Sequence, residues 1–420
     1  MLFKQLGFGE SSGLFTQHRF QWRGTSREVD VLYENVRLLA DDRLKGREDT
    51  WTVVFDYPFD EGNRTPQDDI ARLNEYRGDP ARTVIWLPSF LSPRAQQDLG
   101  RLVILDHILH GDRFDQYTSH LSQVDRIQAR ALATNQCNSL RALLQSRLEV
   151  AYGIAPEPRD AVSHVLDADQ QLRSMDPTFS PRPPVGADLK SALENLLEQM
   201  CAHQYPAHPV FETDIRPQLA KKLWDELQPA LQSPDRRTHL PDLGTRRLVR
   251  SVIPALHLGD TSENAVVLVD HWTRHFHQQM AREQCERPTV SQLREWMERP
   301  RPMGLPGELQ DLVILVFAAT TNRHFTLNGG PYAPDIGKLI DAAELREEQL
   351  PSAQDWQIAR DRASELFGLV PPSVLNSANV ATLAKIVREA VGAKRAAVLA
   401  LLEEWQGSVA EFAAGRKSAR

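Results

Sequence analysis

Short apolar runs and one amphipathic segment alternate along the first 90 residues. After Gly24, apolar side chains occupy every second position within residues 19–38, which predicts a hairpin of two strands. Residues 51–57 (WTVVFDY) form a continuous apolar run that is typical of a buried strand, and residues 83–90 (TVIWLPSF) form another. The pattern therefore predicts several strands near the start of the chain.

The segment between the two apolar runs predicts a helix. Residues 66–77 (PQDDIARLNEYR) are amphipathic, with Thr65 as the N-cap, Pro66 at the first helical position and acidic residues in the first turn. A strand, a helix and a strand within about 40 residues are typical of a βαβ unit in a parallel sheet. We therefore expect an α/β segment, a partial parallel sheet with helices.

Helical periodicity dominates the rest of the chain. Residues 266–283 predict a continuous helix, residues 323–340 a hairpin that turns at Asn328, and residues 376–413 a pair of helices. Helices with a hairpin between them are the ingredients of a winged-helix module. The fold class we expect is an α/β segment followed by mostly α-helical domains, the last of them winged-helix-like.

Changes in pattern and proline content suggest the domain boundaries. The expected parts are an α/β sheet segment (1–91), a helical region packed on it (92–173), a Pro-rich linker (174–189), a helical domain (190–303), a helical, winged-helix-like domain (304–413) and a basic tail (414–420).

Composition narrows the class of protein. Of 420 residues, 41% are hydrophobic and 25% charged, and the net charge of -7 gives no general attraction for nucleic acid. The three cysteines are far apart in the sequence, which argues against a disulfide framework or a zinc ribbon. No apolar run approaches the roughly 20 residues of a membrane-spanning helix. We expect a cytoplasmic protein with no membrane partner.

Asp56 ends the first apolar run and is the leading candidate for nucleotide chemistry. A carboxylate beyond the end of a parallel strand can hold magnesium in P-loop ATPases. However, the pattern G-x-x-x-x-G-K-[ST] occurs nowhere in the chain, and GFGESSG (residues 7–13) lacks the lysine. Asp56 and its neighbour Asp60 can equally be turn and capping acids.

Arg23 and Arg27 flank the predicted turn at Gly24 and are a second candidate. Arginine suits phosphate recognition because its guanidinium is planar and permanently charged. These residues could act on a nucleotide only in a site that another chain or domain completes. The alternative is an ordinary hairpin with two solvated arginines.

A helical histidine pair and a set of basic residues complete the candidates. His271 and His275 have i, i+4 spacing that can hold zinc, but no third ligand lies at a diagnostic distance, so we expect no metal. A metal-dependent enzyme built on this pair is the second alternative function. The candidate DNA-binding residues are Arg246, Arg247, Arg250, Arg323 and Lys338, whose charges could contact phosphates.

Several stretches taken together resemble a known family. The series WRGTSREVDVLYENVR, WTVVFDYPFDEGNRTPQDDIARL, VIWLPSFLSPRAQQDLGRLVILDHIL, RFDQYTSHLSQVDRIQARALATNQ, DPTFSPRPPVGADL and HQYPAHPVFE is similar to the large P-loop ATPases of bacterial BREX phage-resistance systems, of the PglY type and its BrxC relatives. The similarity extends from near residue 18 to about residue 400. Because the chain lacks the phosphate-binding loop, it resembles an internal to C-terminal portion of these proteins.

The resemblance implies a component of an anti-phage complex, with partners such as the BREX DNA methyltransferase, duplex DNA or a second copy of the chain. ATP and magnesium are implied only for the full-length relatives, and no cofactor is expected for this chain alone. We expect no ATPase activity unless another chain completes the site. The first alternative function is a stand-alone DNA-binding or scaffolding module.

Overall fold

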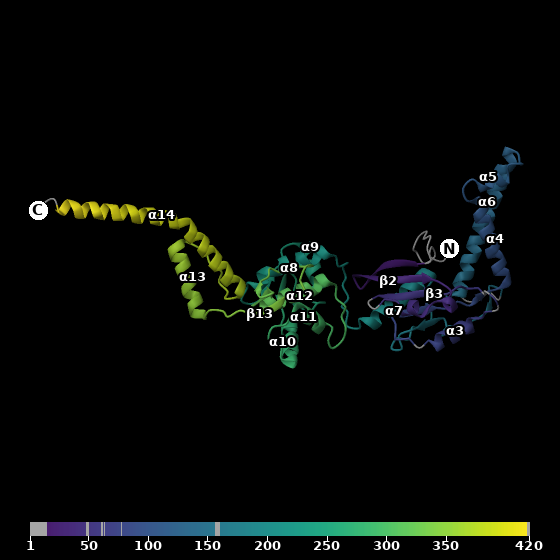
Figure 1. Ribbon diagram of the computed structural model, residues 1–420, viewed down its shortest axis with the longest axis horizontal. Helices are drawn as coiled ribbons and strands as arrows, with labels where there is room; N and C mark the ends of the chain where they lie inside the picture. Colours follow the sequence, from purple (N-terminus) through teal and green to yellow (C-terminus); the bar gives the residue numbers. More distant parts are fainter. Residues whose placement is uncertain are drawn as a thin grey trace. The chain divides into compact units, whose positions relative to one another are not determined.

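The computed structural model describes residues 15–47, 50–59, 62, 64–76, 78–155 and 160–417 (Figure 1). The glycines at 7–13, Asp60 and the last three residues of the basic tail lie outside these ranges. The chain divides into two compact units. Unit 1 comprises residues 1–22 and 26–206, and unit 2 comprises residues 23–25 and 207–420.

A five-stranded mixed sheet forms the centre of unit 1. Its strands, in spatial order, are β1 (Phe15–Trp22), β2 (Thr25–Tyr33), β3 (Trp51–Phe55), β4 (Thr83–Trp86) and β7 (Leu172–Ser174). Strands β2, β3 and β4 are parallel, and β7 is antiparallel to β4. Arg23 and Gly24, with φ of 48° and 81°, form the two-residue turn between β1 and β2, as a primed hairpin turn requires. The predicted hairpin and partial parallel sheet are confirmed.

Helices cover both faces of this sheet because its central strands are apolar on both sides. On one face, Val54 and Ile85 pack with residues of α2 (Asp41–Lys45) and α3 (Pro66–Glu75). On the other face, alternate strand residues such as Val53 pack with α7 (Leu189–Gln204). A capping box between Thr65 and Asp68 begins α3 at the predicted position.

Two long helices lie between β4 and β7 in the sequence and pack against each other (Figure 1). Strand β5 (Phe90–Leu91) leads into α4 (Pro93–Leu109), α5 (Arg113–Tyr117), α6 (Gln123–Ala151) and β6 (Val162–His164), which pairs with β5. Leu102 of α4 packs against Cys137 and Leu144 of α6. A buried ion pair, Arg147 Nη1 to Asp98 Oδ2 at 2.7 Å, also joins the two helices.

The proline-rich stretch at 174–189 packs against unit 1. Phe179 and Leu189 are buried in the same apolar cluster as the strands and α7. The boundary between the two compact units lies between Pro206 and Ala207.

Unit 2 begins with a small three-stranded sheet and its helices. The elements are α8 (Pro217–Leu231), β8 (Arg237–His239), α9 (Leu243–Val252), β9 (Gly259–Thr261) and β10 (Ala265–Leu268). The order of the strands in the sheet is β8, β10, β9, and all pairs are antiparallel. This helix–strand–helix–strand–strand order has one helix fewer than a winged-helix module.

A second set of elements has a related order, with one more helix and one more short strand. It consists of α10 (His271–Glu283), α11 (Val290–Met297), α12 (Gly307–Thr320), β11 (Arg323–Leu327), β12 (Gly330–Pro331) and β13 (Glu344–Glu347). Thr289, between α10 and α11, forms a bridge with Glu344 of β13, and β13 pairs with β11. In both sets, the segment between the first two helices is the first strand position: β8 in the first set and Thr289 in the second. In both sets it pairs with the last strand. The two sets, which share this strand pairing, are the two repeats of unit 2, and the second has the helix order of a winged-helix module.

Helix α12 is the centre of the unit 2 core. Leu309 and all residues from 311 to 318 are buried, so the helix is enclosed on every side. The described ranges contain no helix that combines the length and the apolar character needed to cross a membrane.

The structure corrects two expectations about local structure. Residues 265–268 form strand β10, and the helix begins only at His271, because the run Ala265–Leu268 pairs with strands on both sides. The expected helical pair at 376–413 is one helix, α14 (Ser377–Lys417). The interior Gly392 does not break it, since a single glycine costs a helix only about 1 kcal/mol. The helix closed by Gly368 is confirmed as α13 (Ala353–Phe367).

Candidate functional site

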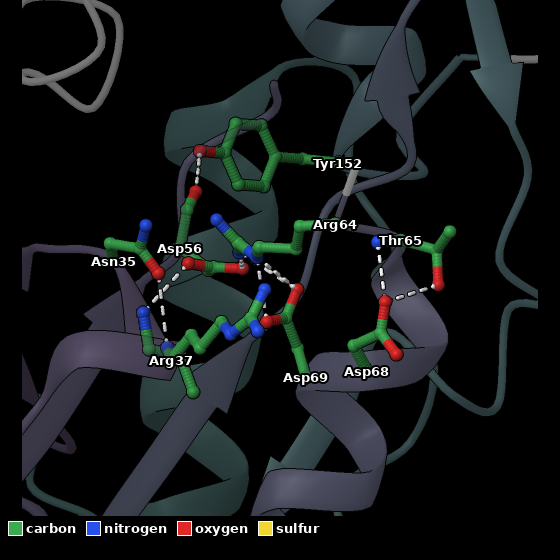
Figure 2. A network of polar contacts seen from close by, with 9 residues as sticks. Asn35, Arg37, Asp56, Arg64, Thr65, Asp68, Asp69 and Tyr152 are labelled. Carbon is green, nitrogen blue, oxygen red and sulfur yellow. Dashed lines mark hydrogen bonds and ion pairs between the residues drawn. The ribbon is translucent and has the colours of Figure 1, made fainter. Parts of the chain in front are cut away.

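Charged residues converge beyond the C-terminal end of β3, where ligands bind in open α/β sheets (Figure 2). Asp56 directly follows the strand, Arg64 lies just before the N-cap of α3, and Asp69 lies in the first turn of that helix. Asp56 and Asp69 have no exposed surface and Arg64 has 1%. The β3–α3 connection thus places one cation between two anions in the interior.

Arg64 binds both carboxylates with its planar fork. Its Nε donates to Asp69 Oδ1 at 2.7 Å and Oδ2 at 2.9 Å, and its Nη2 donates to Asp69 Oδ2 at 2.7 Å. The same Nη2 also donates to Asp56 Oδ2. The guanidinium lies 5.1 Å from the centre of the Phe90 ring, which shields it from solvent. Arg64 is therefore the central residue of the network.

Asp56 is held by further contacts. Its Oδ1 accepts a hydrogen bond of 2.9 Å from the backbone N–H of Val36, and its backbone carbonyl accepts one of 2.6 Å from the Tyr152 hydroxyl. Burial raises the pKa of Asp56 to about 7, a shift that Arg64 opposes and the nearby Asp69 reinforces. Burial also raises the pKa of the Tyr152 hydroxyl.

This environment determines what Asp56 can do chemically. Both of its carboxylate oxygens are engaged, and the side chain has no access to solvent. With all three groups ionised the triad carries one net negative charge, so a proton on Asp56 makes it neutral, in agreement with the raised pKa. In this conformation the network is a structural clamp, and a role for Asp56 in holding magnesium stays a prediction that requires the clamp to open.

Arg27 lies at the opposite end of the parallel strands. Val29 of β2 is level with Trp51 of β3, so Arg27 lies two residues before that level and Asp56 five residues after it. Seven residues of strand at about 3.3 Å each separate the two by roughly 23 Å. Arg27 instead stacks on Tyr205, with its Cζ 4.6 Å from the ring centre. The structure does not bring Arg27 and Asp56 into one site.

A cavity of about 240 Å³ lies beside Arg27 at the end of the sheet away from Asp56. Its lining includes Trp51 and, from α7, Met200 and Cys201. Arg23, in the β1–β2 turn, donates from Nη1 to the carbonyl of His208 at 3.2 Å. The two candidate arginines, Arg23 and Arg27, are therefore both held by contacts with other residues of the chain.

The five candidate DNA-binding residues have different environments. Arg246 donates to the carbonyls of Leu240 and Pro241, and Arg250 to those of Ser262 and Glu263, so both guanidiniums stabilise loops. Arg323 is 9% exposed and donates to the carbonyl of Glu286.

Arg247 and Lys338 lie on the surface, Lys338 beside Asp335 at 3.1 Å. Arg250 is exposed as well, although loop carbonyls hold its guanidinium, so three of the five lie on the surface.

The histidines of α10 make separate contacts. His275 Nε2 lies 2.8 Å from the carbonyl of Trp296, whereas the His271 ring is tilted against the His257 ring with ring centres 4.7 Å apart. Burial and the neighbouring His257 lower the pKa of His271. Across the part of the chain that the structure describes, no group of three or more His, Cys, Asp or Glu residues could hold a metal ion.

Sequence reasoning identified Asp56 but missed Arg64, Asp69 and Tyr152. A signal for Asp69 was present, because it lies four residues before the buried Leu73 and one before Ile70, on the apolar face of α3. An acid on that face requires a buried partner. Arg64 gave no comparable signal because it lies before the helix, outside its periodic pattern, and Tyr152 gave none because 96 residues separate it from Asp56.

The fold and the site define a class of protein: an α/β unit whose strand-end acid is sealed by an arginine, followed by a mostly helical unit with two small sheets. Family models match almost the whole chain. They are the PglY fourth domain at residues 1–205, the fifth domain of the BREX system ATPase PglY at 218–318 and the sixth domain of the same protein at 360–420. The chain belongs to the PglY family of BREX-system ATPases and is a component of that anti-phage system. No solved structure was found to match it.

Proposed function

We propose that this chain is the partner-binding portion of a PglY-type ATPase and performs no nucleotide chemistry of its own. The observation that carries the proposal is the sealed Asp56, whose two carboxylate oxygens are engaged by Arg64 and by the backbone of Val36. The missing G-x-x-x-x-G-K-[ST] sequence supports the same conclusion. Its location would be the cytoplasm, where the other BREX proteins, such as the DNA methyltransferase, would be its partners.

Two measurements test the nucleotide part of the proposal. The purified chain is titrated with ATP and magnesium by calorimetry, and we expect no binding. ATP turnover is then measured after mixing the chain with an N-terminal fragment that carries the phosphate-binding loop. Because Arg27 lies roughly 23 Å from Asp56 along the strands, Arg27→Ala should leave turnover unchanged. Tight magnesium-dependent ATP binding by the chain alone would overturn the proposal.

The partner-binding part is tested with the methyltransferase of the same system. Biolayer interferometry with the full chain immobilised should show saturable binding to that enzyme. A chain heated beyond its unfolding transition is the control for non-specific adhesion. Absence of binding at micromolar methyltransferase would reject this partner.

Duplex DNA is a second candidate ligand, because the second repeat of unit 2 has the helix order of a winged-helix module. The third helix of such a module usually enters the major groove. In the second repeat this helix is α12, which is buried and apolar. Any DNA contact would therefore involve phosphates and show little sequence preference.

Fluorescence anisotropy with a labelled duplex at low and moderate salt tests this second function. Charge reversal of two exposed residues, Arg247→Glu with Lys338→Glu, should weaken binding and reduce its salt dependence. Arg94→Glu with Lys385→Glu, at two other exposed positions, makes the same change in net charge and is the matched control. No binding at low salt would reject the DNA function.

A further inference from the structure

Helix α14 is packed along only its first part. Leu383 is buried against Trp356 and Ala363 of α13, and Val380, Ile386 and Val387 pack on the same cluster. The last contact with α13 is Lys394, whose Nζ lies 5.6 Å from the centre of the Phe367 ring. Figure 1 shows α14 continuing past α13.

Beyond Lys394 the helix carries large apolar side chains that no described residue covers. Trp405 is 65% exposed and Leu402 is 45% exposed, and other apolar residues of this part are similarly open. They are Val398, Leu399, Leu401 and Val409, and Val391, just before Lys394, is exposed as well. A contiguous apolar stripe of this kind on a soluble protein indicates an interaction surface.

The stripe has the spacing of a coiled coil. Val391, Val398 and Trp405 are seven residues apart, and so are Arg395, Leu402 and Val409, each four residues after one of the first set. This is the a/d pattern by which two helices pack side by side over many turns. From Val391 to Val409 it extends over 19 residues, or about 28 Å of helix.

The charges along α14 are complementary to a reversed copy of the same helix. Lys394 and Arg395 lie in the first half of the stripe, and Glu403 and Glu404 in the second half. In a parallel pair Arg395 would face Arg395 of the other copy, whereas in an antiparallel pair it faces Trp405 and the basic half of one helix lies beside the acidic half of the other. The charge pattern therefore favours antiparallel self-association.

We propose that this chain forms a homodimer through an antiparallel coiled coil of the α14 segment from Val391 to Val409. The heptad positions are symmetric about Ala400, so each a residue of one copy faces a d residue of the other. The layers are Val391 with Val409, Arg395 with Trp405, and Val398 with Leu402, each present twice. In the layer of Arg395 and Trp405, the guanidinium of one copy stacks on the indole ring of the other, a favourable contact between a cation and an aromatic face.

The glycines of this segment agree with the proposal. Gly392 and Gly407 lie inside the helix, and a Cβ at either position would meet no described atom within 4 Å. Glycine weakens a helix that has no tertiary support. A partner helix would supply that support to the part of α14 beyond α13.

The association state of the full chain tests the surface. Sedimentation velocity over a range of protein concentrations should show a reversible dimer. Leu402→Glu places a charge in the central layer and should weaken dimerisation at least about a hundredfold. Val370→Glu is the matched control, because Val370 is 93% exposed and outside the stripe, and it should dimerise normally. A wild-type chain that stays monomeric, or a Leu402→Glu variant that dimerises normally, would overturn the proposal.

Cysteine cross-linking tests the orientation of the two helices. In a Cys285→Ser background, which removes the partly exposed native cysteine, Leu401→Cys should form a disulfide with its own copy, since g positions face each other in an antiparallel pair. Trp405→Cys should not, because d faces d only in a parallel pair. The reverse result would overturn the antiparallel arrangement, and circular dichroism checks that both variants fold.

Discussion

The interiors of the two units are stabilised in different ways. Unit 1 encloses a guanidinium between two carboxylates at the end of β3, with all three side chains removed from solvent. Unit 2 instead has a large apolar core around α12. Its buried Asp311 pairs with Arg294, whose side chain keeps 25% exposure. Charged side chains therefore lie within the interior of unit 1, whereas the ion pair of unit 2 lies at the edge of its interior.

This difference predicts which kind of substitution destabilises each unit most. A buried ion network contributes little net stability when intact, but removal of one partner leaves an uncompensated charge in a poorly solvated interior. An apolar core loses stability in proportion to the volume that is removed. Hydrogen–deuterium exchange followed separately in β3 and α12 can distinguish the two responses.

The largest effect is expected for Arg64→Met. Asp56 and Asp69 would stay buried without their cation, and unit 1 should lose about 3–5 kcal/mol. Exchange of the β3 amides should accelerate strongly, while that of the α12 amides should change little. Arg294→Met is the matched variant in unit 2, with a smaller expected loss because its guanidinium is partly solvated. Equal losses for the two variants would contradict the comparison.

A cavity in the apolar core should give a slightly smaller effect. Leu312→Ala removes a fully buried side chain from α12 and should cost unit 2 about 2–5 kcal/mol. Here the α12 amides should exchange faster and the β3 amides should be unaffected. The comparison fails if unit 1 responds as much as unit 2.

The next largest effect is expected in the pH dependence of the stability of unit 1. The pKa of Asp56 is about 7 in the folded protein against 3.8 ordinarily, so the folded state holds a proton that the unfolded state releases. This contribution to stability is complete below about pH 3.8 and is lost as the pH rises through 7, with a slope of at most about 1.4 kcal/mol per pH unit. Asp56→Asn should remove this part of the slope between pH 5 and 8 in denaturant unfolding. A slope that the variant retains in full would show that other groups cause it.

The smallest effect is expected at an exposed ion pair of unit 1. Lys190 and Glu194 on α7 are 3.8 Å apart and more than half exposed. Lys190→Ala should change stability by less than about 0.5 kcal/mol, because solvent screens the pair. A loss comparable with that of Arg64→Met would mean that burial is not what distinguishes the Arg64 network.

Local patterns predicted much of unit 1. The hairpin and the βαβ unit could be predicted because their signals involve only a few adjacent residues. These signals are the apolar runs, the Thr65–Pro66 start of α3 and the turn at Gly24. The strand β10 was not, because its apolar residues also fit helical periodicity and only its pairing with β8 and β9 decides between them.

The repeat in unit 2 was hidden for a similar reason. The two sets differ in loop length and in number of helices, so the sequence shows no fixed period even though the first strand position pairs with the last strand in both. A repeat of topology needs no repeat of side chains as long as each helix and strand buries an apolar face. Only the pairing of Thr289 with Glu344 revealed the first strand position of the second set.

The sequence by itself determined the family, the α/β-then-helical order and the lack of a G-x-x-x-x-G-K-[ST] stretch, because these depend on residues that are adjacent or in ordered series. The tertiary structure decided the role of Asp56. Whether a strand-end carboxylate faces solvent or an arginine depends on which side chains the chain brings to it, and Arg64, Asp69 and Tyr152 reach Asp56 only through packing. Burial and charge pairing are properties of that assembled environment and cannot be read from the acid alone.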